Sequence, residues 1–489
     1  MRPTRWTRLL SLAAIAAVCL TGCAIAVDGH GSTGNAGNVN LGVLGVDPNS
    51  SFDQLAQNSL SDVEGFWRVE YPTVSGGKSL PPIKGGLYSV DGRKVIETRS
   101  AKGQPVENNQ CAQRSIGFLV DNAAYCRLDD SIVWDRIDTH LFGQLAKKYG
   151  DFTVALIFAH EFGHAVQNRL GIFDSQPKTI FTESQADCAA GAWAKSAVDG
   201  RDPHFRDITL AKVDDALEGF LNGRDSTPVN VTEISHGNGF DRLSAVADGY
   251  DKGVTYCYSK GYFDSRVFTE RPFRDQQEAS SGDNTPFEDV IKLGSDNVFV
   301  NDLNRFWTTA AKRIGKTFKP VTIAEAAHPK CGGASSVAEF GYCPDDNTVY
   351  FSQSFAKQSY YSLPDIQVNK TNGDVTLLSN QPADFALGTM FSIAWGYAVR
   401  HQFFGRSMDG SAALIAGLCY TGAYAKDINV APSQGAPQLL LLSPADLDEG
   451  VAATLDVVPR DAAFGAQGTT GLNRVQAFIE GYKSGLSVC

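Results

Sequence analysis

The segment HEFGH at residues 160–164 places two imidazole side chains four residues apart, with a carboxylate between them. On a helix, residues four apart share a face, so His160 and His164 can bind one metal ion. Glu161 is rotated by about 100° around the same helix and can reach a water molecule on that ion without binding the ion itself. Because a five-residue pattern also occurs by chance, a metal site here requires further ligands.

The helix predicted around this motif runs over residues 151–170. Apolar residues recur in it at helical spacing, Asp151 can cap its start and Gly171 can end it. A second helix is predicted to begin with a capping box made by Thr182 and Gln185. The sequence therefore predicts two helices that could lie against each other at the motif.

The second predicted helix carries two carboxylates on one face. Glu183 falls in its first turn and Asp187 one turn later. This arrangement resembles the gluzincins, in which HExxH on one helix is completed by the Glu of an ExxxD motif on the next. The resemblance implies that Glu183 is the third metal ligand and that Asp187 orients a ligand imidazole.

A narrower resemblance rests on several motifs in order: HEFGHAVQ, then QADC followed by AGAW, then SHG at residue 235 with Arg242 and a closing Cys257. Together they resemble the bacterial putative neutral zinc metallopeptidase family over nearly all of the first half of the chain. Ser184 stands where that motif has an apolar residue, and the flanking sequences differ, so the resemblance does not imply a substrate.

A His, His, Glu set leaves one position of a tetrahedral zinc ion open, which is typical of catalytic sites. Zinc would lower the pKa of a bound water to about 7, and Glu161 would take its proton and pass it to the leaving amine. We expect one Zn²⁺ per chain and hydrolysis of peptide bonds in a peptide or protein substrate. Hydrolysis of cell-wall peptides is an open alternative at the same site. The alternative from another class is a non-catalytic envelope scaffold or binding protein with a structural zinc in the first domain.

The sequence also contains an internal repeat. DFTVALIFAHEFGHAVQ at residue 151 aligns without gaps with DFALGTMFSIAWGYAVR at residue 384, and four further segments match in the same order. This pattern predicts a duplication. We expect a zinc metallopeptidase-like domain at 59–262, a linker at 263–297 and a pseudo-metallopeptidase domain at 298–489.

The second copy lacks the chemistry of the first. The five positions aligned with the predicted site residues carry only Ile393, Ala394, Tyr397, Leu414 and Leu418. We expect this domain to bind no metal, and its predicted roles are shielding the cleft, recognising substrate or docking an envelope protein partner.

His236 is a further candidate, because it faces Gly468 and so is lost together with the ligands. It could donate a hydrogen bond to the transition state, although an ordinary capping or surface histidine is the alternative.

The predicted fold class is α+β, a zincin-like domain dominated by helices and present twice. Helices are expected near 137–149, 151–170, 182–198 and 206–222. The extended run SIVWD at 131–135 precedes them, and we expect it to offer a sheet edge to an extended peptide substrate.

Eight cysteines fall four to each copy, which predicts disulfides and an oxidising compartment. The predicted pairs are Cys111 with Cys126, Cys188 with Cys257, Cys331 with Cys343, and Cys419 with Cys489. Cys188 adjoins a predicted site residue, but its counterpart survives in the copy without a metal site, so we interpret it as structural.

The N-terminal residues 1–22 read as an export signal, with a basic start and a short apolar stretch. The following LTGC resembles a bacterial lipobox, which implies cleavage before Cys23 and acylation of its thiol. A secretory signal with a coincidental cysteine is the alternative. Residues 23–58, rich in glycine, asparagine and serine at their start, are predicted to form the lipid anchor and a flexible tether.

The predicted location is the bacterial cell envelope, on the extracytoplasmic side of a membrane that holds the lipid. A net charge of −11 at pH 7 offers no basic field for phosphate backbones, so nucleic acid is not an expected partner.

Overall fold

The computed structural model describes residues 41–489 except 177, 226–235, 270, 274–275, 277–278, 280–283, 327–338, 407, 409, 430–439, 461–463 and 465. The predictions for the signal at 1–22, for Cys23 and for Cys331 lie outside the described residues. Among the described helices, none combines the length and the apolar character needed to cross a membrane.

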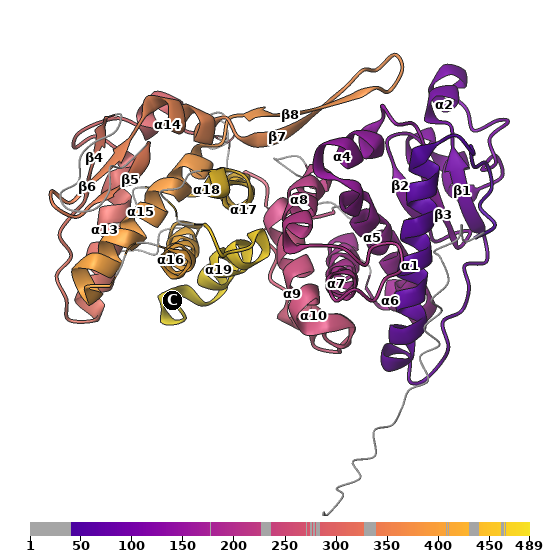
Figure 1. The fold of residues 1–489 in the computed structure, drawn as a ribbon, viewed down its shortest axis with the longest axis horizontal. Coiled ribbons are helices and arrows are strands. Elements are labelled where there is room, and N and C mark those ends of the chain that lie inside the picture. Colours follow the sequence, from indigo (N-terminus) through magenta and orange to yellow (C-terminus); the bar gives the residue numbers. More distant parts are fainter. Residues whose placement is uncertain are drawn as a thin grey trace, which may run out of the picture. The chain divides into compact units, whose positions relative to one another are not determined.

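The first half of the chain combines helices with one small sheet (Figure 1). Its elements are α1 (Ser51–Val74), β1 (Gly86–Val90), α2 (Gly92–Thr98), α3 (Gln110–Arg114), η1 (Ile116–Phe118), β2 (Ala123–Cys126), β3 (Ser131–Asp135), α4 (Leu141–Tyr149), α5 (Asp151–Leu170), α6 (Ile172–Ser175), α7 (Thr179–Val198), α8 (Leu210–Phe220), η2 (Leu221–Gly223), α9 (Gly239–Cys257) and α10 (Tyr262–Ser265). The predicted α+β class is confirmed.

The sheet of the first half has the strand order β1-β3-β2. β1 pairs parallel with β3, and β2 pairs antiparallel with it. The expectation that the run at 131–135 offers an edge to substrate is therefore wrong, because β3 has a neighbour on each side. The pairing of β1 with β3 is not evident from the sequence, because the paired residues, such as Gly86 and Ser131, are far apart in the chain. The edge toward α5 belongs to β2.

The helix α5 carries the HEFGH motif through the interior of the first half. It is buried along most of its length, and α1, α4, α7 and α8 all pack against it. Its boundaries agree with the prediction, and Gly171 ends it in the left-handed conformation with φ 69°. Asp151 is its first residue and not its cap, because the cap position is Gly150 with φ 89°, which provides no side-chain hydrogen bond.

The helix α7 begins at Thr179, three residues before the predicted capping box. Thr182 lies inside the helix, where its hydroxyl donates to the Thr179 carbonyl at 2.8 Å. The Gln185 amide donates instead to the Cys257 carbonyl on α9, at 2.9 Å. The capping-box prediction is wrong because the Thr182 hydroxyl bonds one turn back within α7 and the Gln185 amide bonds to α9. Glu183 consequently lies in the second turn of α7.

The second half of the chain repeats several of these features. Its elements are α12 (Phe287–Val290), α13 (Val298–Arg313), β4 (Thr322–Glu325), β5 (Phe340–Cys343), β6 (Thr348–Phe351), α14 (Gln353–Tyr360), β7 (Leu363–Val368), β8 (Val375–Gln381), α15 (Asp384–Phe404), α16 (Ser411–Asn429), α17 (Asp446–Leu455), α18 (Val457–Arg460), α19 (Gly471–Ser484) and η4 (Gly485–Ser487). Its sheet has the order β4-β6-β5, with one parallel and one antiparallel pair, as in the first half.

Disulfides and close helix contacts also recur. The structure contains the predicted bonds Cys111–Cys126, Cys188–Cys257 and Cys419–Cys489. Cys343 is also disulfide-bonded. Gly163 of α5 faces Ala186, and a Cβ there would meet the Ala186 Cα at 3.1 Å. These parallels support the duplication that the sequence predicts.

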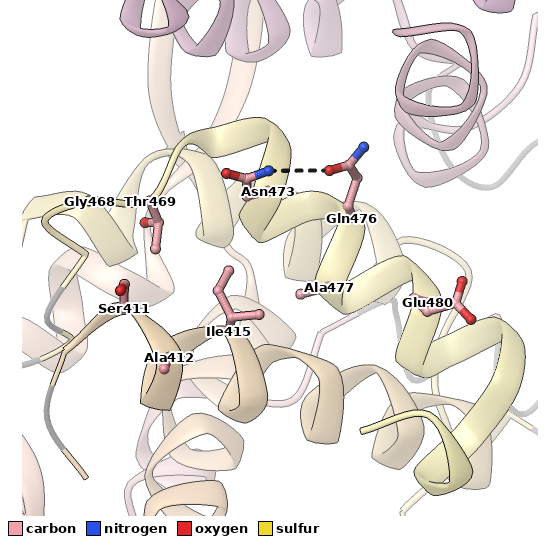
Figure 2. Close-up of a pocket in the computed structure, with 9 residues that line it drawn as sticks. All are labelled: Ser411, Ala412, Ile415, Gly468, Thr469, Asn473, Gln476, Ala477 and Glu480. Atoms are coloured by element: carbon pink, nitrogen blue, oxygen red, sulfur yellow. Dashed lines mark hydrogen bonds between the residues drawn. The ribbon is translucent and has the colours of Figure 1, made fainter. Parts of the chain in front are cut away.

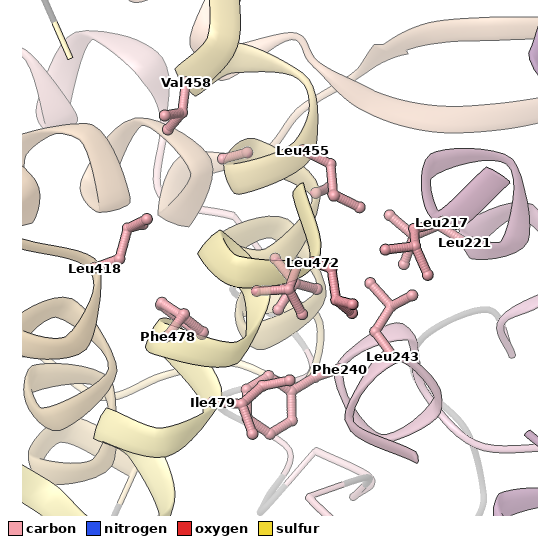
Figure 3. Close-up of a cluster of buried hydrophobic side chains, with 14 of the residues drawn as sticks. Leu217, Leu221, Phe240, Leu243, Leu418, Leu455, Val458, Leu472, Phe478 and Ile479 are labelled. Carbon is pink, nitrogen blue, oxygen red and sulfur yellow. The ribbon is translucent and has the colours of Figure 1, made fainter. Parts of the chain in front are cut away.

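The two halves contact each other through apolar side chains and through a hairpin of the second half. Figure 3 shows side chains of α8, η2 and α9 facing those of α17 and α19, among them Phe240, whose ring centroid lies 6.0 Å from that of Phe478. The β7–β8 hairpin reaches α4, where the His140 Nε2 atom lies 2.9 Å from the Asn372 carbonyl. The opposite ring nitrogen of His140 lies 2.6 Å from Asp135.

Candidate metal centre

Three side chains from α5 and α7 converge on one point. The Nε2 atoms of His160 and His164 lie 3.1 Å apart. The Glu183 carboxylate lies 3.1 Å from the first of these nitrogens and 3.3 Å from the second. Nitrogen ligands of a tetrahedral zinc ion are about 3.3 Å apart, because each Zn–N distance is about 2.0–2.1 Å. The three predicted ligands therefore have the spacing that a zinc ion requires, and the Glu183 Oε2 atom is buried without a hydrogen-bond partner.

The opposite ring nitrogens fix how the two imidazoles point. The His160 Nδ1 atom lies 2.6 Å from Asp187, and the His164 Nδ1 atom lies 2.8 Å from the Gln167 Oε1 atom. Each Nδ1–H can therefore donate to an acceptor, which leaves the Nε2 lone pairs free to face the same point. Gln167 is a positioning residue that the sequence did not single out, although it stands one turn after His164 and closes the HEFGHAVQ motif.

Asp187 is in turn held by Arg242 of α9. The guanidinium donates to its two carboxylate oxygens at 3.1 and 3.0 Å. It also donates to the Gly223 carbonyl and lies over the Phe220 ring, 4.3 Å from its centroid. Burial alone would raise the pKa of Asp187, but the charges of Arg242 and His160 lower it. Arg242 belongs to the motifs quoted from the sequence. Its contact with Asp187, 55 residues earlier in the chain, shows what it does.

In the metal-free centre both imidazoles hold a proton more strongly than an ordinary histidine does. Burial alone would lower the pKa of His160, but the carboxylates of Asp187 and Glu183 raise that pKa to about 10. The Glu183 carboxylate likewise raises the pKa of His164 against the effect of burial. Burial would raise the pKa of Glu183, and the two imidazoles hold it well below its ordinary value. A metal ion must therefore displace protons to bind.

This competition predicts that zinc affinity rises with pH. The pKa of His160 is about 10, so zinc must displace a proton from it at lower pH. For each proton displaced, the apparent zinc affinity should rise about tenfold per pH unit. Chelator competition at pH 6, 7 and 8 measures the slope, and calorimetry in buffers of different ionisation enthalpy counts the protons released. An affinity that does not change between pH 6 and 8 would contradict this assignment of protons.

Glu161 lies beside the three ligands and is held by the sheet. Its Oε2 atom accepts a hydrogen bond from the Tyr125 backbone N–H at 2.8 Å, and its Oε1 atom lies 3.9 Å from the His160 Nε2 atom. It does not belong to the converging group. This position fits a proton acceptor beside the metal. Alternate residues of a strand present their backbone groups to the same side, so Ala123 of β2 also faces this edge.

Two cavities border the centre. The smaller, of about 220 Å³, is walled largely by apolar side chains, including Phe142, Leu145 and Phe220. The other, of about 320 Å³, is lined by more polar residues, including Arg127 and Thr182. His160 and Glu161 line both, and so does His236. The centre thus borders two cavities of different polarity.

His236 lies at the mouth of both cavities. Its side chain is 58% exposed, and its ring Nδ1 atom lies 3.2 Å from an Asp225 carboxylate oxygen. The hydrogen bond to the Asp225 carboxylate raises the pKa of His236 against the effect of burial. The structure thus places His236 near the centre, while its role in the transition state stays a prediction.

The corresponding place in the second half is apolar. The aligned residues Ile393, Ala394, Leu414 and Leu418 are fully buried, and Tyr397 is 5% exposed. No charged side chain stands at any of these five positions.

Comparisons with known proteins agree with this centre. Residues 108–255 match the family model described as "Putative neutral zinc metallopeptidase". Uncharacterized protein Rv2575 of Mycobacterium tuberculosis is 27% identical over 153 residues, which cover 26% of this chain and 51% of that protein. Uncharacterized protein YpfJ of Escherichia coli is 29% identical over 154 residues, covering 26% of this chain and 50% of that protein. The chain thus spans about half the length of these curated relatives, and no solved structure matches it. The resemblance stated from the sequence motifs is confirmed for residues 108–255, which match the model of the putative neutral zinc metallopeptidase family.

Proposed function

We propose that this protein is a zinc-dependent peptidase of the bacterial cell envelope, anchored through a lipid on Cys23 and facing away from the cytoplasm. The observation that carries the proposed activity is the convergence of the two Nε2 atoms and Glu183, with Glu161 held just outside that group by Tyr125. A structural zinc site would have no need for such an uncoordinated carboxylate. The cysteine pairs support an oxidising compartment.

We assign separate roles in hydrolysis to several residues of the chain. His160, His164 and Glu183 would hold zinc, which would supply an acidified water and polarise the scissile carbonyl. Glu161 would accept the proton of the attacking water and deliver it to the leaving amine. Asp187 and Gln167 keep the imidazoles oriented, and Arg242 keeps Asp187 ionised in a buried place.

The substrate is a peptide in extended conformation. The outward edge of β2 offers the Ala123 N–H and C=O for pairing with a substrate strand, in place of the β3 edge expected from the sequence. The walls of the smaller cavity favour an apolar substrate side chain next to the cleaved bond. The second half of the chain is proposed to bind no metal.

Metal stoichiometry tests this function. Oxidised protein supplied with zinc should hold one zinc per chain by mass spectrometry, and Glu183→Ala should lose it or bind it at least tenfold more weakly. Glu97→Ala, which removes an exposed carboxylate on α2, is the matched control and should keep one zinc. A folded wild-type protein that takes up no zinc would refute the proposal.

A further inference from the structure

A groove lies on the second half of the chain between α16 and α19 (Figure 2). Its volume is about 480 Å³, and Ala412, Ile415, Asn473, Ala477 and Glu480 are among the residues that line it. In Figure 2, Ile415 points from α16 toward α19. The groove is far in sequence from every proposed ligand of the metal centre, so it requires a separate account.

The helix pair that forms this groove has a structural counterpart in α7 and α9. Each pair is joined by a disulfide, Cys188–Cys257 in the first half and Cys419–Cys489 in the second. Each pair also has one close contact at a glycine of its second helix. A Cβ on Gly249 would lie 1.8 Å from the Cys188 carbonyl oxygen, and a Cβ on Gly481 would lie 1.9 Å from that of Cys419. Residues of the two pairs can therefore be matched one by one.

This match relates the groove to buried positions of the first half. The matched residues are Ser184 with Ile415, Asp241 with Asn473, Ala245 with Ala477, and Asp248 with Glu480. In the first half all four are buried, with Ala245 fully so. In the second half Asn473 and Glu480 are exposed and the other two are partly exposed.

The chain itself covers these positions in the first half, through the segment 262–269. The Tyr262 hydroxyl donates to the Ser184 carbonyl at 2.7 Å, and Tyr262 is fully buried. The Arg266 guanidinium donates to Asp248 at 2.6 Å.

The rest of the segment adds polar and aromatic contacts. The Thr269 N–H donates to Asp241 at 2.8 Å. The rings of Phe263 and Phe268 contact that of Phe181, with centroids 5.8 and 4.9 Å apart. Three residues of this segment thus cover the matched positions of the first half: Tyr262, Arg266 four positions later, and Thr269 three positions after that.

We propose that the groove of the second half binds a segment of the same kind from a partner protein: a peptide that forms one helical turn and then extends, with an aromatic residue followed four positions later by an arginine. Glu480 stands where Asp248 holds Arg266, and its side chain accepts only a hydrogen bond from the exposed Ser484 hydroxyl in the described structure. Ile415, in place of Ser184, offers an apolar surface to the aromatic ring. Asn473 replaces Asp241 and keeps an acceptor for a backbone N–H.

The chain supplies its own probe for the test. A fluorescent peptide with the sequence of residues 260–269, KGYFDSRVFT, should bind the oxidised full-length chain in an anisotropy titration. Glu480→Arg should weaken this binding at least tenfold, because like charges then face each other. A peptide with its arginine replaced by glutamate should fail on the wild-type protein and bind Glu480→Arg, which excludes unfolding as the cause of the loss.

Controls separate this groove from other binding modes. Glu97→Arg changes the same charge on an exposed helix of the first half and should leave peptide affinity unchanged. Absence of saturable binding, or binding that Glu480→Arg does not alter, would overturn the proposal. Sedimentation of the protein alone distinguishes a second copy as the occupant: a dimer that Glu480→Arg dissociates, with no binding of the peptide, would also overturn it.

Discussion

Glu161→Gln is expected to lower kcat for peptide hydrolysis by about 10²–10⁴-fold while one zinc per chain stays bound. Glutamine has the shape of glutamate, and its amide oxygen can still accept the Tyr125 N–H that now binds Glu161 at 2.8 Å. It cannot take a proton from water. Because Glu161 is not one of the three converging ligands, the metal should be unaffected.

The measurement pairs cleavage of a peptide library with zinc analysis of the same samples. Glu97→Gln serves as the control, since that residue is exposed on α2 and away from the centre in sequence and structure. Equal cleavage by the variant and the wild type would show that Glu161 is not the proton acceptor. Zinc bound to both proteins with cleavage by neither would favour the structural-zinc scaffold.

Arg242→Met should affect both stability and metal affinity. It leaves the fully buried Asp187 carboxylate without its cation, which costs about 3–5 kcal/mol in the free energy of unfolding. Asp187 then orients the His160 ring less well, and zinc affinity should fall about 10–100-fold. Urea unfolding and chelator competition measure the two effects.

The internal repeat provides a matched control in Arg474. This arginine occupies the equivalent position in the second half, where Leu418 is aligned with Asp187. Its Nε atom donates to the Thr454 carbonyl at 2.7 Å, and its Nη2 atom lies 3.9 Å from an Asp214 carboxylate oxygen. Arg474→Met should cost only about 1–2 kcal/mol and leave zinc affinity unchanged. Equal zinc affinity in the two variants would contradict the positioning role of Arg242.

Some elements could be predicted because their bounds are set by residues within or next to them in the sequence. The helix around HEFGH was predicted over 151–170 because its apolar spacing and Gly171 are local features, and α5 has these bounds. The start of α7 was missed because Thr182 bonds to the Thr179 carbonyl inside the helix, and Gln185 bonds to a carbonyl on α9 that only tertiary packing brings near. The central position of β3 depends on β1, whose pairing no local pattern reveals.

The residues of the candidate site also fall into two groups, those that helical spacing predicted and those that it did not. Helical spacing brings His160 and His164 onto one face, and the ExxxD spacing places Glu183 and Asp187 on the next helix. The role of Arg242 could not be read from spacing, because it depends on how α9 packs against α7. That of Gln167 depends in part on α7, since its amide also donates to the Thr182 carbonyl. Buried polar residues near a motif are the signal that could have identified them.

The hydrogen bond from Tyr125 to Glu161 also protects the fold against self-association. An uncovered strand edge can template pairing with another chain, and β2 is such an edge. The carboxylate from α5 occupies one of its outward donors, so the group proposed as the proton acceptor also blocks strand pairing at that position. On this reasoning alanine at position 161 would bare that donor and glutamine would not, which makes glutamine the safer substitution during purification and storage.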